Sequence, residues 1–146
     1  MKTIKITIAA LALSLLTACA GSKQYVPLAS IEPQSDTATI CLIRKSSIIG
    51  AANGVNVFDG EDKVASVGSG GYVLWESEPG AVNVRVHEAG LSMVRVSSTI
   101  DIEARSGQVH FITAEATAGA YTLTEIDAEE GKSLISKLKA PQYQEK

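Results

Sequence analysis

Apolar and polar residues alternate in short runs from Thr37 to Ile126. In the run at 81–88, valines at positions 82, 84 and 86 alternate with polar residues. A period of two residues is typical of a β-strand that turns one face toward a core. The pattern predicts strands at about 37–44, 54–58, 62–67, 71–77, 81–88, 93–102, 108–116 and 121–126.

Turn residues separate these runs at intervals of about ten residues. Asp59 and Gly60 suit a two-residue hairpin turn, whose central positions need positive φ. Pro79 and Gly80 suit another turn, because proline fixes its own φ and glycine accepts a positive one. This spacing predicts a mainly β fold, an antiparallel β-sandwich of about seven to eight strands with one C-terminal helix.

The helix is predicted to follow the last strand. Asp127 is a suitable N-cap, and Glu130 completes a capping-box pattern. Gly131 is expected to weaken the helix, and Pro141 to end it. Three apolar residues share the face that is expected to pack on the sheet: Leu134, Ile135 and Leu138.

The start of the chain resembles the signal peptide of a bacterial lipoprotein. Two lysines precede residues 6–16, an almost wholly apolar run that falls short of the about 20 residues of a membrane span. Residues 16–19 (LTAC) match the lipobox. The match implies cleavage between Ala18 and Cys19, a diacylglycerol thioether on Cys19 and an acyl chain, such as palmitate, on its new amino group. An ordinary signal peptide with a chance cysteine is the alternative.

A lipid on Cys19 would hold the chain at a membrane, because two or more acyl chains give stable attachment. Ala20 follows the cysteine, which in enteric-type bacteria implies transfer to the outer membrane, with the inner membrane or the cell surface as alternatives in other lineages. Residues 20–36 contain two prolines and no periodicity, so they are predicted to form an extended linker that reaches roughly 55 Å. The predicted organisation is a signal peptide at 1–18, the lipidated cysteine and linker at 19–36, a β-sandwich at 37–139 and a tail at 140–146.

Charge and cysteine content narrow the possible partners. Removal of residues 1–18 takes away Lys2 and Lys5 and no acidic residue, so the formal net charge changes from −3 to −5. An acidic chain lacks the basic footprint that nucleic acid requires, so no nucleic-acid partner is expected. If Cys19 carries lipid, Cys41 has no partner for an intrachain disulfide, and we expect it to be buried as a small apolar residue.

The sequence shows no recognisable catalytic or metal-binding constellation. His87 and His110 lack partners at the close spacing of a zinc site, so we expect solvated strand histidines, no metal and no cofactor. Residues 68–71 (GSGG) are glycine-rich, but strands on both sides favour an inter-strand loop over a phosphate loop. The Gly-x-Ser-x-Gly elbow of many serine hydrolases is missing.

Aromatic residues mark a possible binding surface. Tyr72 and Trp75 lie three positions apart, so a strand directs them to opposite faces. One of the two is expected in the core. The other is a candidate for an exposed binding surface together with Arg85 or Tyr121, although core or edge packing suits both rings.

Residues 37–139 resemble the lipoproteins gathered as domain of unknown function 2846. The segments that carry the resemblance are ATICLIRKSS at 38–47, VNVFDGEDKVASVGSGGYVLWESEPGAVNVRVHEAG at 55–90 and TLTEIDAEEGKSLISKLK at 122–139. The middle segment is also similar to the PEGA repeat. These resemblances imply an envelope lipoprotein with a transthyretin- or PEGA-like sandwich, and they imply no activity and no catalytic residues.

The sequence therefore predicts a lipid-anchored, non-enzymatic module on the periplasmic side of the outer membrane. Such a module would be structural, or would hold a partner protein or a glycan near that membrane. Two alternatives stay open: an envelope enzyme with an unrecognised site, and an accessory subunit of an envelope complex whose strand edges pair with its partner.

Replacing the lipobox cysteine tests the anchor. The Cys19→Ala chain cannot accept a thioether-linked lipid, so we expect it to remain uncleaved or to appear in the soluble fraction. Membrane fractionation and the apparent mass of the product measure this. A mature-sized Cys19→Ala chain that still sediments with membranes would rule out the lipoprotein interpretation.

Overall fold

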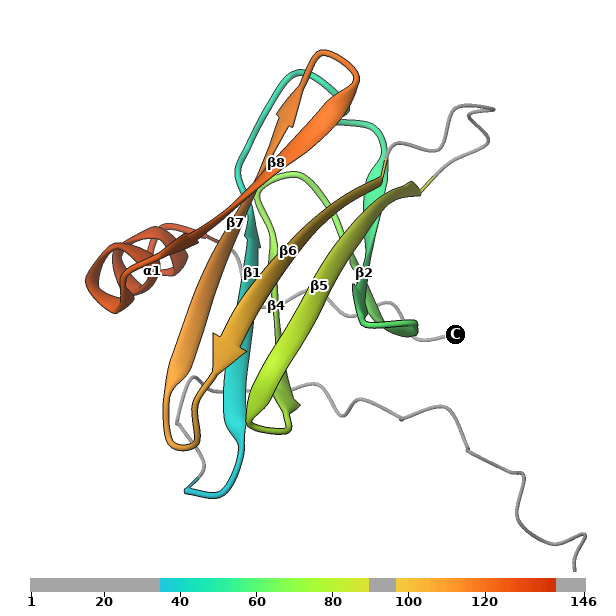
Figure 1. Cartoon of the computed structure of the whole chain (residues 1–146). Helices are drawn as coiled ribbons and strands as arrows, with labels where there is room; N and C mark the ends of the chain where they lie inside the picture. Colours follow the sequence, from blue (N-terminus) through green and yellow to red (C-terminus); the bar gives the residue numbers. More distant parts are fainter. Residues whose placement is uncertain (1–34, 90–96, 139–146) are drawn as a thin grey trace, which may run out of the picture.

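The computed structural model describes residues 35–89 and 97–138 of the chain. The predicted signal peptide, Cys19, nearly all of the linker, residues 93–96 and Pro141 lie outside these residues. Figure 1 shows the strands and the helix in chain order. Within the described residues these are β1 (Ala38–Arg44), β2 (Gly54–Asp59), β3 (Asp62–Val67), β4 (Tyr72–Ser77), β5 (Gly80–Ala89), β6 (Ser97–Ala104), β7 (Val109–Thr117), β8 (Ala120–Ile126) and α1 (Ala128–Ile135).

The strands form two four-stranded sheets, with the orders β4-β1-β7-β8 and β3-β2-β5-β6. The prediction of a mainly β sandwich with one C-terminal helix is confirmed for the described residues. One pair departs from the antiparallel pattern, because β1 and β7 run parallel with Ile40 opposite His110. Between these two strands the chain crosses to the other sheet for β2 and β3, returns for β4 and crosses again for β5 and β6, so no hairpin fixes their relative direction.

The main core lies between the two sheets. The valines of β5 are buried and the residues between them are partly exposed, which confirms the two-residue period. They meet apolar side chains of the opposite sheet, among which Trp75 and Ile112 are fully buried. Burial of a side chain of this size stabilises the fold by about 1.5–3 kcal/mol.

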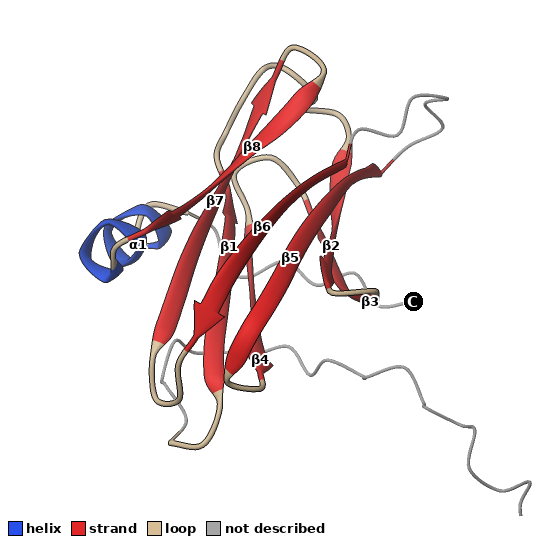
Figure 2. Ribbon diagram, in the orientation of Figure 1, coloured by secondary structure: helices blue, strands red, loops and turns tan. Residues whose placement is uncertain are grey.

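A second, smaller core lies on the outer side of the β4-β1-β7-β8 sheet. All seven residues of β1 are buried, so this strand is covered on both faces. Figure 2 shows α1 beside β7 and β8, outside the sheet. The helix contributes Ile135, with Leu134 and Leu138 at the margin, to a cluster whose sheet residues are Cys41, Ile43, Leu74 and Phe111.

The ends and interior of α1 show why its sequence suits this position. The Asp127 side chain accepts a hydrogen bond of 2.8 Å from the backbone N–H of Glu130, which confirms the predicted N-cap. Gly131 has a packing role that the sequence reading missed. A Cβ at this position would overlap the ring of Phe111, so glycine lets the helix approach the sheet closely.

Gly131→Ala separates helix propensity from packing. Propensity alone predicts a gain of about 1 kcal/mol from alanine. Because the added methyl group overlaps Phe111, we expect instead a loss of roughly 1–3 kcal/mol in the free energy of unfolding. Urea denaturation measures the difference, with Ser133→Ala at an exposed position of the same helix as the control. A Gly131→Ala chain that is more stable than wild type would show that α1 does not pack on Phe111.

Candidate functional site

The structure places the predicted surface residues in three separate environments. Tyr72 and Trp75 lie on opposite faces of β4, as predicted. Trp75 is fully buried between the sheets, and its indole N–H donates to the Asp59 carboxylate at 3.1 Å. The interpretation of Trp75 as an exposed binding residue is therefore wrong, because both its ring and its N–H are satisfied inside the fold.

Tyr72 is half-buried at the margin of the smaller core, close to Cys41. Burial, and to a lesser extent the neighbouring thiol, raises the pKa of its phenol above the usual value. Arg85 lies on β5, in the other sheet. The structure therefore does not bring Tyr72, Trp75 and Arg85 together on one surface.

Arg85 is instead part of a group on the outer face of the β3-β2-β5-β6 sheet. Its guanidinium carbon lies 5.0 Å from the centre of the Phe58 ring, directly opposite on β2. The centre of the His87 ring lies 5.0 Å from the centre of the same Phe58 ring, and the two ring planes are inclined by 50°. We call Phe58, Arg85 and His87 the Arg85 cluster. Phe58 holds the cationic and imidazole side chains against the sheet by ring contacts.

Polar side chains surround the Arg85 cluster and are also held in fixed positions. Ser66 donates to the Asn56 amide oxygen at 2.6 Å, and Asn83 donates to the Asp101 carboxylate at 2.7 Å. Thr99 lies opposite Arg85 on β6 and is exposed. Among the described residues no helix covers this face, whereas α1 covers the outer face of the other sheet.

A buried arginine organises one end of the sandwich. Arg44 is only 1% exposed at the end of β1. Its guanidinium donates to the backbone oxygens of Asn53 at 2.5 Å, Gly50 at 2.7 Å and Val67 at 3.3 Å. It also donates to the Tyr121 hydroxyl at 3.4 Å and lies 5.7 Å from the centre of that ring. Local sequence does not predict that Arg44 is buried, because an arginine at the end of a strand is normally solvated.

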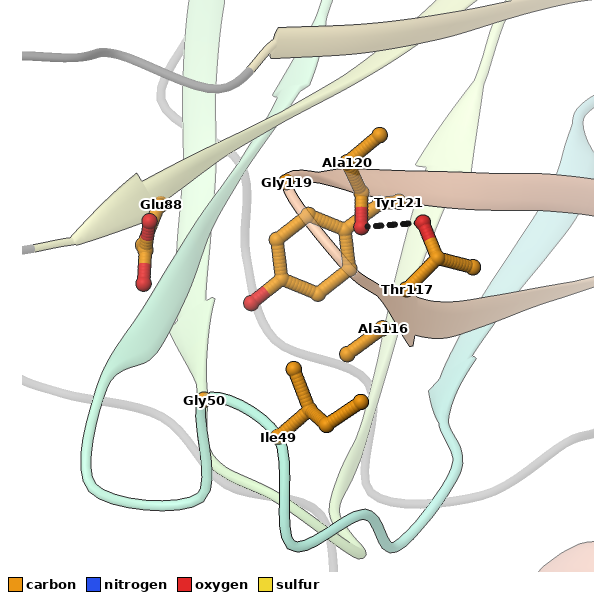
Figure 3. A pocket seen from close by; sticks show the side chains of 8 residues that line it. All are labelled: Ile49, Gly50, Glu88, Ala116, Thr117, Gly119, Ala120 and Tyr121. Carbon is orange, nitrogen blue, oxygen red and sulfur yellow. Dashed lines mark hydrogen bonds between the residues drawn. The ribbon is translucent and has the colours of Figure 1, made fainter.

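A small cavity of about 100 Å³ lies between the loop after β1 and the hairpin that joins β7 to β8 (Figure 3). Arg44 donates to two of its lining residues, Gly50 and Tyr121. Tyr121 forms one wall, and Glu88 lies at the rim. Burial raises the pKa of Tyr121, Glu88 adds to this and Arg44 opposes it. The phenol is therefore neutral near pH 7 and acts as a hydrogen-bonding group. The other lining residues are Ile49, Gly50, Ala116, Thr117, Gly119 and Ala120.

His110 is not the solvated histidine that the sequence reading predicted. Its side chain is buried, with Nδ1 2.8 Å from the Glu125 carboxylate. Its Nε2 accepts a hydrogen bond of 3.1 Å from the backbone N–H of Arg105, which assigns the proton to Nδ1. Both nitrogens are therefore engaged. Glu125 is 15 residues away in sequence and reaches His110 only through the pairing of β7 with β8.

The remaining candidates also have structural surroundings. Cys41 is fully buried, and burial raises the pKa of its thiol to about 12, which confirms the expected small apolar residue. The loop at 68–71 joins β3 to β4, as predicted for an inter-strand connection. Within residues 35–89 and 97–138, no three His, Cys, Asp or Glu side chains are grouped to hold a metal ion. No helix in the same residues is both long and apolar enough to cross a bilayer.

The sequence matches no protein-family model, and no curated protein is similar enough to count as a relative. The resemblance to domain of unknown function 2846 therefore stays a prediction.

Arg44→Met removes the shared donor at the end of the sandwich. The backbone oxygens of Gly50, Asn53 and Val67 then lose a charged partner, so we expect the free energy of unfolding to fall by roughly 3 kcal/mol or more. Arg105→Met, at an exposed position, should change it by less than about 0.5 kcal/mol. Urea denaturation compares the two. Similar losses for both variants would mean that the Arg44 contacts do not stabilise the fold.

Proposed function

We propose that the chain is a lipid-anchored lipoprotein of the cell envelope, whose β-sandwich is a non-enzymatic structural or binding module on the periplasmic side of the outer membrane. The lipobox at 16–19 supports the anchor. The Arg85 cluster is the observation that carries the binding role, because it is a prearranged group on a sheet face that no described helix covers.

The geometry of Arg85 suits recognition of a partner that offers acceptor oxygens. A guanidinium presents several N–H donors in a fixed plane and pairs well with carboxylates and hydroxyls. The Phe58 ring holds this plane in position, so less side-chain entropy is lost when a partner binds. Envelope proteins and glycans both offer such oxygens.

Two groups capable of chemistry, His110 and Cys41, are engaged in the fold. Both ring nitrogens of His110 have hydrogen-bond partners, and the Cys41 thiol is buried with a raised pKa. Neither is presented to solvent as a base or nucleophile. This supports a binding module in preference to the alternative of an envelope enzyme.

Site-specific crosslinking in cells tests the proposed surface. A photoreactive benzoylphenylalanine at Thr99, beside Arg85, should capture an envelope protein or glycan, and Arg85→Ala should remove the adduct. The same photoreactive residue at Ser133, exposed on α1, is the control and should capture no adduct that depends on Arg85. Adducts that persist in the Arg85→Ala chain, or that form equally at Ser133, would show that this face is not the binding surface.

A further inference from the structure

The loop between β1 and β2 exposes large apolar side chains. We call residues 45–53 the isoleucine loop. Ile48 is 97% exposed and Ile49 is 53% exposed, and they are the exposed large hydrophobic residues of the described chain. Ala51 and Ala52 beside them are also exposed. Together they form an apolar tip, which is a sign of an interaction surface when it is held in one position.

The isoleucine loop carries no charge at its tip. From Ser46 to Phe58 the sequence contains no Asp, Glu, Lys or Arg. The charges at its margins have partners, since the Lys45 ammonium lies 3.6 Å from Glu115 and the Glu88 carboxylate accepts from the Asn53 amide at 2.7 Å. The tip can therefore leave water without stripping the solvent from an unpaired charge.

Part of the backbone of the isoleucine loop has hydrogen-bond partners within the protein. Alternate N–H groups have acceptors: those of Lys45, Ser47, Ile49, Ala51 and Asn53 donate to Ala114 O, Ser69 Oγ, Ser47 Oγ, Ile48 O and Gly50 O. The Arg44 guanidinium donates to the backbone oxygens of Gly50 and Asn53 in the same loop. This pairing lowers the cost of moving these N–H groups into the less polar membrane interface.

The position of the loop allows contact with the bilayer that holds the anchor. Residues 35–37 lie at the opposite end of the sandwich (Figure 1), where the Thr37 oxygen accepts from Gly107. The ten residues of β5 give the domain a length of roughly 33 Å along the strands. The predicted linker reaches roughly 55 Å, so it is long enough for the far end of the domain to turn back to the same membrane.

We propose that the isoleucine loop inserts Ile48 and Ile49 into the interfacial region of the bilayer and so orients the domain on the membrane. A protein partner could also cover two isoleucines, but the uncharged tip, the partial pairing of its backbone and the anchor that keeps the domain beside a bilayer favour a lipid surface. This contact depends on the proposed lipid anchor, which keeps the loop at a high local concentration beside the bilayer. It leaves the Arg85 cluster, on a sheet face, free for a partner.

Depth-dependent quenching tests the contact with the full chain in vesicles of phosphatidylethanolamine and phosphatidylglycerol. A coumarin amino acid replaces Ile48 in one chain and Glu61, exposed in the turn at the far end of β2, in another. Nitroxide lipids should quench the fluorophore at position 48 several-fold more than the one at position 61. Ile49→Ser should reduce quenching at position 48, and Ala52→Ser, at an exposed position in the same loop, should not.

Equal quenching at positions 48 and 61, stronger quenching at 61, or no quenching at 48 would overturn the proposal. The absence of lipid on Cys19 is detected separately. An unlipidated Cys19 reacts with maleimide, whereas the buried Cys41 thiol does not. If Cys19 proves free, a maleimide lipid attaches the chain to the same vesicles at that residue. The quenching comparison then tests the loop independently of natural lipidation.

Discussion

The guanidinium of Arg44 connects segments that are distant in the sequence. Its acceptors belong to the loop after β1, to the end of β3 and to β8. The backbone of Arg44 joins the β3–β4 connection as well, because its N–H donates to Gly71 and its oxygen accepts from Gly70. A buried cation is costly without partners, so each of these segments must stay in place for the others to be stable. The isoleucine loop, the end of β3 and the β3–β4 connection depend on this arrangement.

The two outer faces of the sandwich differ because only one is covered by the described helix. β1 and β7 are largely buried on both faces, since α1 packs over Phe111 and its neighbours. The other sheet keeps a clear alternation in β5, with apolar residues inward and the Arg85 cluster outward. The two proposed contacts, recognition on this sheet face and insertion of the isoleucine loop, therefore use different residues.

Local pattern predicted the described strands and the N-cap of α1, because each depends on residues close together in sequence. It placed the β2–β3 turn at Asp59 and Gly60, but Asp59 pairs with Asp62, so the central residues are Gly60 and Glu61, and of these only Gly60 has positive φ. The parallel pairing of β1 with β7 and the contact of His110 with Glu125 arise from the order of strands in the sheet, which alternation does not encode. Arg44 was missed for the same reason, since its acceptors come together only in the folded chain. Gly131 was assigned a cost in helix propensity because the ring that it accommodates lies on another element.

The hydrogen bond between Trp75 and Asp59 places the intrinsic fluorophore of the chain at the contact between the two sheets. Trp75 is the single tryptophan in the sequence, and it belongs to one sheet while its carboxylate partner ends a strand of the other. Ser77 donates to the same carboxylate at 2.9 Å, so Asp59 fixes the separation of the two layers at this edge. All indole fluorescence therefore originates at the junction of the sheets. A shift in its emission records the opening of the sandwich, with no other tryptophan to obscure it.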